Sequence, residues 1–323
     1  MADEQRVDVD RAKELLKRRI LGAMPTAGAY ETGLDGVRMH RLDETTEPQN
    51  CFYRPMIVKM VQGNKRVFIG ADEYRYGESD IMVTGVDMPG ANMFCEASPA
   101  SPSLSISIDL DRNLIAQLAL EIPYKGLDAG GVVRGVHVQP LEADLLDAYL
   151  RLAELFDQPE RLPVLGPMIL REIHYLLLTG PNGHRLRSFH TAGSQANHVA
   201  RAISWMKQNL AASVHVDELA GKVNMAPSTF HRHFKEVTTL SPVQFQKRIR
   251  LHEAQRLMLM QDMDASSASA AVGYESLSQF TREYKRLFGD PPRRDVRRLR
   301  EEALFARPAE RRVSPNRPQP GSS

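Results

Sequence analysis

The amino-acid sequence predicts an α+β chain with a β-rich N-terminal part and an all-α C-terminal part in which one helix-turn-helix pattern occurs twice. Short apolar runs separated by turn residues fill most of residues 36–140, and such runs are typical of strands. From residue 216 to residue 292, apolar side chains instead recur every three or four positions, which is the period of a helix with one buried face. Charge follows the same division: residues 1–194 carry 21 Lys and Arg against 27 Asp and Glu, whereas residues 195–300 carry 17 against 10. A basic C-terminal half favours contact with nucleic acid there.

Composition limits the class of protein. The chain has 323 residues, of which 42% are hydrophobic and 25% are charged, as expected for a folded protein of about two domains. Its two cysteines, Cys51 and Cys95, cannot form a disulfide framework and suit a reducing compartment. Five acidic residues among the first twenty exclude a secretory signal, and no apolar run reaches the ~20 residues that cross a bilayer. We therefore expect a cytoplasmic protein with no membrane association.

Residues 36–140 alternate between candidate strands and turns. Clusters of Gly, Pro, Asn and Ser separate the apolar runs, and many short strands at such intervals predict a β-barrel or sandwich. A helix over residues 10–22, with Leu15, Leu16 and Ile20 facing inward, precedes them. The candidate strands are residues 56–61, 66–69, 80–84 and 103–108, and the candidate turns are residues 62–65, 76–78 and 98–102.

The β-rich part lacks the residues that an enzyme of this shape would need. Metal-dependent barrels bring two or three histidines and a carboxylate to one ion, but residues 36–140 contain only His40 and His137. They contain no His-x-His pair, no glycine-rich phosphate loop and no Gly-x-Ser-x-Gly turn. We therefore expect no catalytic residue, no metal and no cofactor. A small-molecule pocket inside the barrel is the favoured alternative, because small barrels can enclose a ligand.

Two amphipathic helices follow the β-rich part, at residues 141–156 and 164–177. The second is apolar over much of its circumference, which indicates burial on more than one side. Packing on the barrel and dimerisation explain this pattern equally well. A turn at residues 179–183 and a small, polar stretch at residues 188–197 place a linker at 181–196, and a further helix that contains Trp205 follows at residues 198–210.

The repeated pattern lies in residues 216–292. Phe230 and Arg232 match Phe280 and Arg282 at a separation of fifty residues, and internal repetition is a strong indication of duplicated structure. The turn before the second copy is one residue longer, so the separation upstream of it is forty-nine. In each copy the second helix has a buried aromatic face and an exposed polar face. The exposed positions are Ser228, His231, Arg232 and Lys235 in the first copy and Ser278, Thr281, Arg282 and Lys285 in the second.

A long helix is expected between the two copies. Ser241 can cap a helix whose first residue is Pro242, where the missing N–H costs nothing, and the helix could run to about Met260. Nineteen residues at ~1.5 Å each give about 28 Å, and successive major-groove faces of B-DNA lie about 34 Å apart. The connecting helix is therefore about long enough to present both polar faces to one side of a duplex.

The repeat resembles the DNA-binding domain of AraC/XylS-type transcription regulators over roughly the last third of the chain. The runs 52–55, 62–65 and 104–111 resemble the cupin-like N-terminal barrel of one subgroup of these regulators. In the C-terminal part the resemblance rests on Leu219-Ala220, Ser228-Thr229-Phe230-His231-Arg232-His233-Phe234-Lys235 and Leu240-Ser241-Pro242, then on Val272-Gly273-Tyr274-Glu275-Ser276, Gln279-Phe280, Arg282-Glu283-Tyr284-Lys285 and Phe288-Gly289.

The resemblance implies a function and a set of partners. It implies a sequence-specific transcription regulator that binds double-stranded promoter DNA and responds to a small-molecule effector. It also implies RNA polymerase as a partner and a homodimer that pairs through the helices at residues 141–177. Activation is the expected mode, although the residues leave activator and repressor both open, and they identify neither the effector nor the target genes.

Side-chain chemistry assigns roles to the exposed residues. Arginine suits bidentate contact with guanine, so Arg232 and Arg282 are the candidates for base readout. Lys235 and Lys285 are assigned to the phosphate backbone. Taken singly, an Arg or Lys on an amphipathic helix usually belongs to a solvated face, and recurrence at matched positions in both copies favours base readout by the two arginines. The side chains assigned to shorter-range contacts with bases or phosphates are Ser228, His231, Ser278, Gln279 and Thr281.

The sequence thus predicts four segments: an N-terminal sensor and dimerisation domain at 1–180, a linker at 181–196, a DNA-binding domain at 197–300 with units at 216–238 and 265–288, and a disordered tail at 301–323. The second unit is expected to be looser, because residues 265–271 contain only Ala and Ser. Two alternatives stay open: an enzyme with a cupin-like domain fused to a DNA-binding module, and a general nucleic-acid binder. Cys51 or Cys95 could also act as a thiol that senses electrophiles, although a buried, inert cysteine is the simpler interpretation.

Overall fold

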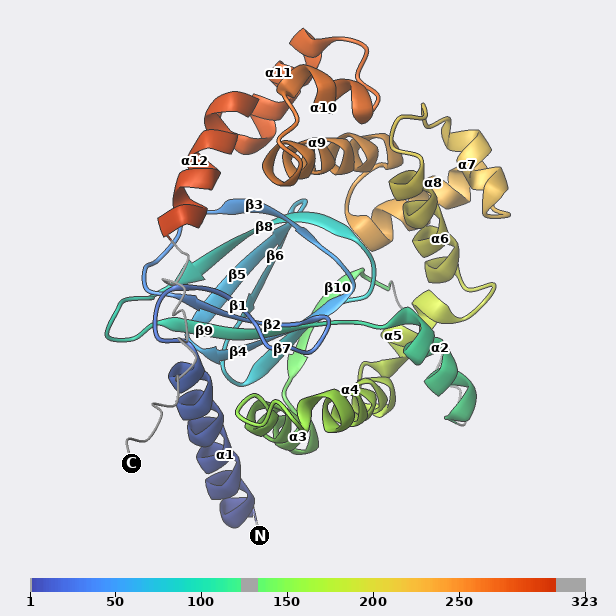
Figure 1. Ribbon diagram of the computed structural model, residues 1–323. Helices are drawn as coiled ribbons and strands as arrows, with labels where there is room; N and C mark the ends of the chain where they lie inside the picture. The colour runs from blue at the N-terminus through green and yellow to red at the C-terminus, as the bar shows by residue number, and fades with distance from the viewer. Residues whose placement is uncertain (1, 123–132, 306–323) are drawn as a thin grey trace, which may run out of the picture.

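The computed structural model describes residues 2–122 and 133–305, and it places a β-rich half beside a helical half (Figure 1). The β-rich half has two antiparallel sheets. One has six strands in the order β1-β2-β9-β4-β7-β10, and the other has four in the order β3-β8-β5-β6. The strands are β1 (Gly28–Glu31), β2 (Val37–Leu42), β3 (Gln49–Tyr53), β4 (Met56–Gln62), β5 (Asn64–Ile69), β6 (Asp72–Tyr76), β7 (Asp80–Thr84), β8 (Met88–Cys95), β9 (Ser103–Asp109) and β10 (Val136–Pro140).

All four strands predicted from apolar runs are present, as β4, β5, β7 and β9. Six further strands lack a clear apolar run in the sequence. Of these, β1, β3, β6 and β10 lie at sheet edges, where only part of each strand needs to be buried. The strand β6 has Asp, Glu and Arg among its five residues, and only Tyr76 is buried. Its pairing with β5 could not be predicted from its composition.

The two faces of the six-stranded sheet have different partners. Successive side chains of a strand point to opposite faces, so Ile57 of β4 packs among the helices of the N-terminal half, whereas Val58 and Met60 belong to the core shared with the four-stranded sheet. The outer face is covered by α1 (Ala2–Ala23), α3 (Ala143–Leu155) and α4 (Leu162–Thr179), with α2 (Arg112–Glu121) beside α4. The predicted α+β fold with a β-rich N-terminal half is therefore confirmed, as two facing sheets rather than one continuous sheet.

One inward-facing prediction for α1 is wrong. Leu16 and Ile20 are buried in the core against the outer face of the sheet, as predicted, but Leu15 is 36% exposed. The residues of α1 that pack on this core include Val9, Ala12, Leu16 and Ile20, which share one face, and Leu15 lies about 100° around the helix from Leu16. Its hydrophobicity alone therefore gave the wrong orientation.

The helical half contains the predicted repeat. Helices α7 (Val216–Lys222) and α10 (Ala265–Ala271) begin forty-nine residues apart, and α8 (Pro227–Thr238) and α11 (Leu277–Phe288) begin fifty residues apart. The inserted residue therefore lies in the turn, as predicted. The other helices are α5 (Gly183–His190), α6 (Gln195–Gln208), the long α9 (Pro242–Met260) between the two copies, and α12 (Pro292–Phe305), which follows the second copy as α9 follows the first.

Two segments contain helices that the sequence did not predict. The stretch 181–196, expected to link two domains, contains α5, whose Leu186 and Phe189 are buried. Helix α12 continues to Phe305, into the stretch 301–323 that the sequence predicts as disordered, and residues 306–323 lie outside the described residues. In the part of the chain that the structure describes, no helix is long and apolar enough to cross a membrane.

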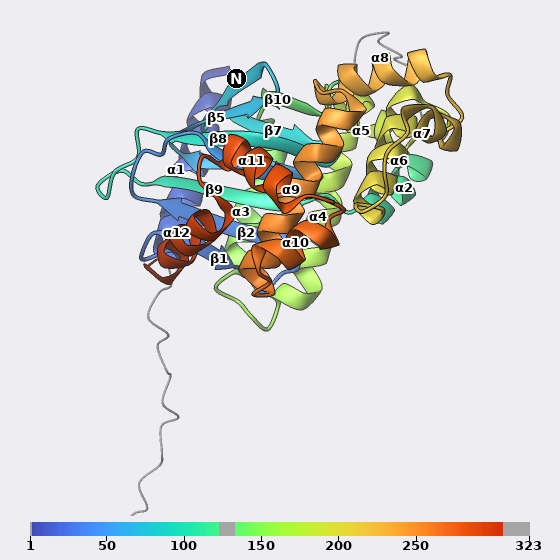
Figure 2. The same cartoon turned by 90° about the horizontal axis from the view of Figure 1, so that it is seen from above.

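The apolar core is continuous between the β-rich half and the first helix-turn-helix unit. Val58, Met60 and Val67 of the sheets belong to the same buried cluster as Phe230 and Phe234 of α8. The second unit has a separate core that includes Phe280 and Tyr284. Figure 2 shows α9 and α11 lying across the β-rich half, with α8 farther out.

Candidate nucleic-acid interface

Helix α8 is strongly amphipathic, which fixes the side chains that it presents to solvent. Phe230, Phe234 and Val237 are buried, and Phe230 and Phe234 pack with ring centroids 5.4 Å apart. The opposite face is therefore left for polar residues. All four predicted contact residues of the first unit are exposed there: Ser228, His231, Arg232 and Lys235.

Helix α11 repeats this arrangement. Phe280 and Tyr284 are fully buried, and their ring centroids lie 5.5 Å apart. Four of the five predicted residues of the second unit are exposed, and Thr281 is half-buried. Helix α11 therefore presents Ser278, Gln279, Arg282 and Lys285 on one exposed surface, with Thr281 at its edge.

Both helices end in the same way. Thr239 and Gly289, which are fifty residues apart, follow α8 and α11 with φ angles of 63° and 88°. A residue with positive φ terminates a helix by turning the chain back toward its last carbonyl groups. Glycine adopts this conformation freely, whereas a β-branched residue such as threonine does so at a cost.

A single helix, α9, sets the spacing between the two units. The Ser241 hydroxyl accepts a hydrogen bond from Gln244 N, and Gln244 Oε1 accepts one from Ser241 N, which completes a capping box with Pro242 at the first position. Nineteen residues span about 28 Å. The predicted start and end of this helix, Pro242 and Met260, are confirmed.

The basic residues of the two exposed surfaces carry uncompensated charge. Within the described residues, Arg232, Lys235, Arg282 and Lys285 form no ion pair with a carboxylate, although many other arginines of the chain do. Arg232 makes one weak contact, with its Nη2 3.4 Å from His233 Nε2. Because unpaired cations are available to phosphates and base edges, both surfaces suit nucleic acid.

Glu283 is a structural residue of the second unit that the sequence did not single out. Its carboxylate accepts hydrogen bonds from Lys247 Nζ of α9 at 2.9 Å, from the Tyr274 hydroxyl at 2.8 Å and from Gln279 Nε2 at 3.3 Å. Burial opposes the charge of Glu283, and these three donors outweigh it and lower the pKa of the carboxyl. Glu283 thereby connects α9, the turn and α11, and it orients Gln279.

Asp295 is a second residue of this kind. It is fully buried, and it accepts hydrogen bonds from Gln255 Nε2 at 2.7 Å, from the Tyr284 hydroxyl at 2.7 Å and from Arg298 Nη2 at 2.6 Å. These donors come from α9, α11 and α12. In the sequence, Asp295 stands among arginines and resembles a surface residue, so only the three-dimensional contacts reveal its role.

Hydrogen bonds join the β-rich half to the last turn of α8 and to the residue that follows it. The carbonyl groups at the end of a helix have no partner within the helix. Gly135 N donates to Val237 O at 2.9 Å, Arg134 Nη1 donates to Glu236 O at 2.9 Å, and the Thr239 hydroxyl donates to Ile69 O at 3.1 Å. The Arg134 charge also complements the negative end of the helix dipole.

The same half of the molecule reaches the matched carbonyl of α11. Asn50 Nδ2 of β3 donates to Leu287 O at 2.5 Å, and Leu287 follows Val237 by fifty residues. Phe52 of β3 contacts the His252 ring of α9 at 5.7 Å between centroids, and His252 contacts Phe288 of α11 at 5.1 Å. The β-rich half therefore holds both helices that carry the predicted contact residues.

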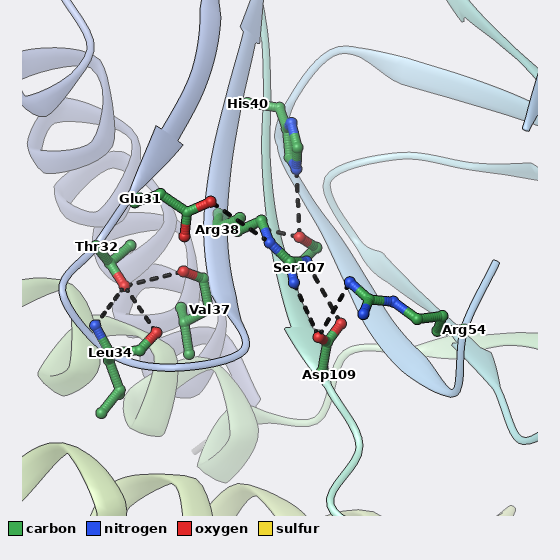
Figure 3. Close-up of polar contacts among 9 residues, drawn as sticks. All are labelled: Glu31, Thr32, Leu34, Val37, Arg38, His40, Arg54, Ser107 and Asp109. Carbon is green, nitrogen blue, oxygen red and sulfur yellow. Dashed lines mark hydrogen bonds and ion pairs between the residues drawn. The ribbon is translucent and has the colours of Figure 1, made fainter. Parts of the chain in front are cut away.

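Polar groups also line the inner face of the six-stranded sheet (Figure 3). Arg38 Nη2 lies 2.9 Å from Asp109 Oδ2, and Arg54 Nη2 lies 3.6 Å from the same atom, so one carboxylate serves two cations. His40 Nε2 is 3.3 Å from the Ser107 hydroxyl. Burial, with smaller effects of Lys65 and Arg38, lowers the pKa of His40 to about 4, so His40 is neutral at neutral pH.

The structure bears on two chemical expectations of this half. In the described part of the chain no group of three or more His, Cys, Asp and Glu residues is arranged to hold a metal ion. Burial, only partly opposed by Lys65 and by neighbouring hydrogen bonds, raises the pKa of the Cys51 thiol. A protonated thiol is a weak nucleophile, which argues against electrophile sensing by Cys51.

Comparisons with known proteins now identify the family. Residues 33–185 match the N-terminal domain of AraC-type transcriptional regulators, and residues 219–298 match a helix-turn-helix domain family. The first match covers the β-rich half and the second covers the repeat, and together they span well over half of the chain. The chain belongs to the AraC-type transcriptional regulators.

Curated relatives of this AraC-type regulator match its C-terminal part. The transcriptional activator RhaS of Pectobacterium carotovorum is 26% identical over 103 residues, which are 32% of this chain and 37% of RhaS. The regulator GbdR of Pseudomonas aeruginosa is 28% identical over 104 residues, which are 32% of this chain and 28% of GbdR. The chain thus matches only about a third of the length of these relatives.

Two solved structures support the fold over most of the AraC-type chain. The apo form of a ToxT point variant from Vibrio cholerae aligns with a TM-score of 0.57 and 11% sequence identity, and the alignment covers 81% of this chain and 97% of that one. ToxT bound to a methylnaphthalenyl butenoic acid aligns with a TM-score of 0.53 and 12% identity over 84% of this chain and 99% of that one. At such identities the likeness concerns the fold alone.

Proposed function

We propose that this AraC-type protein is a transcription regulator that binds promoter DNA through both helix-turn-helix units and is controlled by a small-molecule effector. The observation that carries the proposal is the matched pair of exposed, unpaired Arg and Lys residues on α8 and α11, held at a set spacing by α9. The DNA-binding domain occupies residues 197–300, and the sensor domain occupies residues 1–180.

Each of the two units has one residue for base readout and one for contact with the phosphate backbone. Arg232 and Arg282 read guanines in successive major grooves, and Lys235 and Lys285 bind phosphates. The remaining polar residues of the two surfaces, Ser228, His231, Ser278, Gln279 and Thr281, make shorter contacts. Three exposed arginines of α12 extend the basic surface beyond the second unit and add phosphate attraction: Arg293, Arg294 and Arg297.

Substitution of Arg232 by alanine tests the proposal. Arg232→Ala should cost ~1–3 kcal/mol on a specific site and relax preference at one base pair, because a bidentate contact is lost. Lys235→Ala should weaken binding to all sequences similarly and flatten its salt dependence. Fluorescence anisotropy of the full chain with DNA from upstream of its own gene and with random DNA, over a salt series, measures both.

Arg66→Ala is a suitable control, because Arg66 lies on β5 rather than on α8 or α11 and is paired with Glu73. It should leave the affinity for both DNAs unchanged. Equal losses on specific and random DNA for Arg232→Ala would show that Arg232 does not read bases. Equal, steeply salt-dependent binding to both DNAs by the unaltered chain would instead identify a general nucleic-acid binder.

We further propose that the regulator is a homodimer that pairs through α4. One side of α4 packs on the sensor core through Ile169, Ile173 and Leu177. Its other side exposes a stripe at helical spacing that includes Val164, which is 66% exposed, and Met168, which is 64% exposed. An apolar stripe of this kind is typical of an interface, which favours dimerisation over simple packing on the barrel.

Met168→Glu should convert the dimer to a monomer, because it places a charge in the centre of this stripe. Sedimentation velocity of the full chain measures the change. Leu120→Glu on α2 is the matched control, since Leu120 is 90% exposed outside the stripe, and it should leave the mass unchanged. A monomeric unaltered chain, or a dimer that tolerates Met168→Glu, would contradict pairing through α4.

The remaining parts of the proposal follow from the family. The chain carries out no catalysis of its own. It activates transcription through contact with RNA polymerase, in line with RhaS, which is named an activator.

A further inference from the structure

We propose that the effector site is a cavity at the junction of the two halves, between β3 and α9, and that its ligand is a compact apolar molecule with one acidic group. This inference rests on the proposed function and supplies its site and ligand class. The cavity has a volume of about 590 Å³, within the range of small-molecule sites. Its walls come from both halves of the molecule, which include Cys51 and Phe52 of β3 and Ile249 and Leu259 of α9.

The charges at the cavity favour an anion. Arg54, Lys207 and Arg256 line it, whereas Glu253 is the one carboxylate among the lining residues, and it is already paired with Arg256 at 2.7 Å. Arg54 and Lys207 each pair with a carboxylate that also pairs with a second arginine. Asp109 is held more closely by Arg38 than by Arg54, as Figure 3 shows, and the buried Asp87 serves both Arg112 and Lys207.

Each of these carboxylates therefore faces two cations, and the cavity wall keeps an excess of positive charge. An anionic group of a ligand would balance it through charge-assisted hydrogen bonds. Arg54 is the most available of the three cations, because its 3.6 Å separation from Asp109 exceeds hydrogen-bond distance.

His252 lines the cavity and carries a polar atom that no other described residue uses. Its Nε2 is buried and has no hydrogen-bond partner in the described part of the chain. Burial, with a smaller effect of Arg248, lowers the pKa of this imidazole to about 4, so it is neutral at neutral pH and can either donate or accept one hydrogen bond. A buried polar atom without a partner costs free energy that a polar ligand group would recover.

The apolar walls define the body of the ligand. Phe52, Leu210 and Ile249 provide aromatic and branched surfaces, which suit an aromatic or branched body rather than a sugar. The inner space between the two sheets, by contrast, is occupied by buried side chains such as Val58, Met60, Val67 and Met82. The junction therefore fits an aromatic acid better than the space inside the barrel does.

A ligand in this cavity would act directly on the second helix-turn-helix unit. It would lie against Phe52 and His252, the first two rings of a continuous series. The centroid distances are 5.7 Å from Phe52 to His252, 5.1 Å from His252 to Phe288 and 4.4 Å from Phe288 to Tyr284. Occupancy of the cavity would thus change how β3 holds α11, and with it the position of Arg282.

A fluorescent aromatic acid, anilinonaphthalene sulfonate, tests the site in the full chain. The single tryptophan, Trp205, lies two residues before the cavity residue Lys207, so energy transfer from Trp205 reports binding near the junction. We expect one saturable site. His252→Phe keeps the ring contacts but removes Nε2, and Arg54→Gln removes a cation from an exposed position; each should weaken binding about tenfold, the loss expected for one hydrogen bond to a charged group.

Two further variants make the test specific. Arg75→Gln removes a comparable exposed arginine from β6, outside the cavity, and should leave the affinity for the dye unchanged. Ser105→Leu enlarges a buried side chain of β9 that faces the space inside the barrel. Unchanged affinity in both cavity variants, or a loss in Ser105→Leu alone, would overturn the junction site.

DNA binding, measured in parallel, separates the site from the proposed function. We expect the dye to change the affinity of the full chain for its specific DNA and to have a smaller effect on His252→Phe. Specific DNA binding that the dye leaves unchanged would refute the effector site and leave the regulator intact. Saturable dye binding with the expected variant losses, in a chain that shows no sequence preference, would refute the regulator and leave the site.

Discussion

The two helix-turn-helix units share a backbone plan, yet they are supported in different ways. In the first unit Phe234 packs edge-on against Phe245 of α9, with ring centroids 5.3 Å apart, and this core continues into the β-rich half. Fifty residues later Tyr284 and Asp295 occupy the matched positions, and a buried hydrogen bond of 2.7 Å replaces the ring contact. The core of the second unit is a separate cluster.

The two units are therefore attached to the β-rich half in different ways. The first unit is part of the sensor core, so its position follows that of the sheets. The second is attached through Asn50 and through the rings of Phe52 and His252. A repeat can therefore keep its exposed polar surface while the way in which each copy is anchored changes, and under the proposed junction site the more lightly attached copy is the one that a ligand would move.

The largest effects that test this comparison are expected from Asp295→Ala and from its counterpart in the first unit, Phe245→Ala. Asp295→Ala removes the buried acceptor of the Tyr284 hydroxyl and of Gln255 Nε2, which should destabilise the second unit by ~3 kcal/mol. Native-state hydrogen exchange should show faster exchange in α10, α11 and α12 and unchanged protection in α8. The counterpart Phe245→Ala should cost ~3–5 kcal/mol and reduce protection in α8 and in the sheets. If Asp295→Ala loosened the sheets equally, the two cores would not be independent.

A smaller effect is expected from the helix caps. The Ser276 hydroxyl accepts a hydrogen bond from Gln279 N at the start of α11, whereas Ala226 offers no such acceptor at the start of α8. Ser276→Ala should therefore destabilise the second unit by ~1 kcal/mol, and Ala226→Ser should stabilise the first by a similar amount. Thermal unfolding measures both changes. Opposite signs for the two substitutions are required, and a loss in both would mean that α8 is fixed by its docking rather than by its cap.

The sequence predicted those features that depend on local pattern. Helical periodicity located α8, α9 and α11, and the one-residue slip between the copies correctly located the longer turn. The exposed positions of the predicted contact residues also followed from periodicity, with Thr281 less exposed than expected. These features are local because a helix needs only its own residues to set which side chains share a face.

Features that depend on distant contacts were not predictable in this way. Asp295 and Glu283 resemble surface charges until α9 and α11 are placed around them. The docking of α8 uses the backbone N–H of Gly135, which no side-chain pattern can reveal. The second unit was expected to be looser because α10 is poor in large aliphatic residues, and Asp264 caps that helix through Ser267 N, a contribution that apolar content does not register.

The contact between Thr239 and the turn at Gly70 also constrains how this chain can vary. A side chain at position 70 would overlap that of Thr239, and Gly70 itself has a φ of 60°. The threonine in turn occupies a conformation that its matched residue, Gly289, adopts without strain, and its hydroxyl is bound to Ile69 O. The two positions are therefore interdependent, because a larger residue at one requires a smaller residue at the other. A substitution at only one of them would disturb the contact between the first unit and the β-rich half.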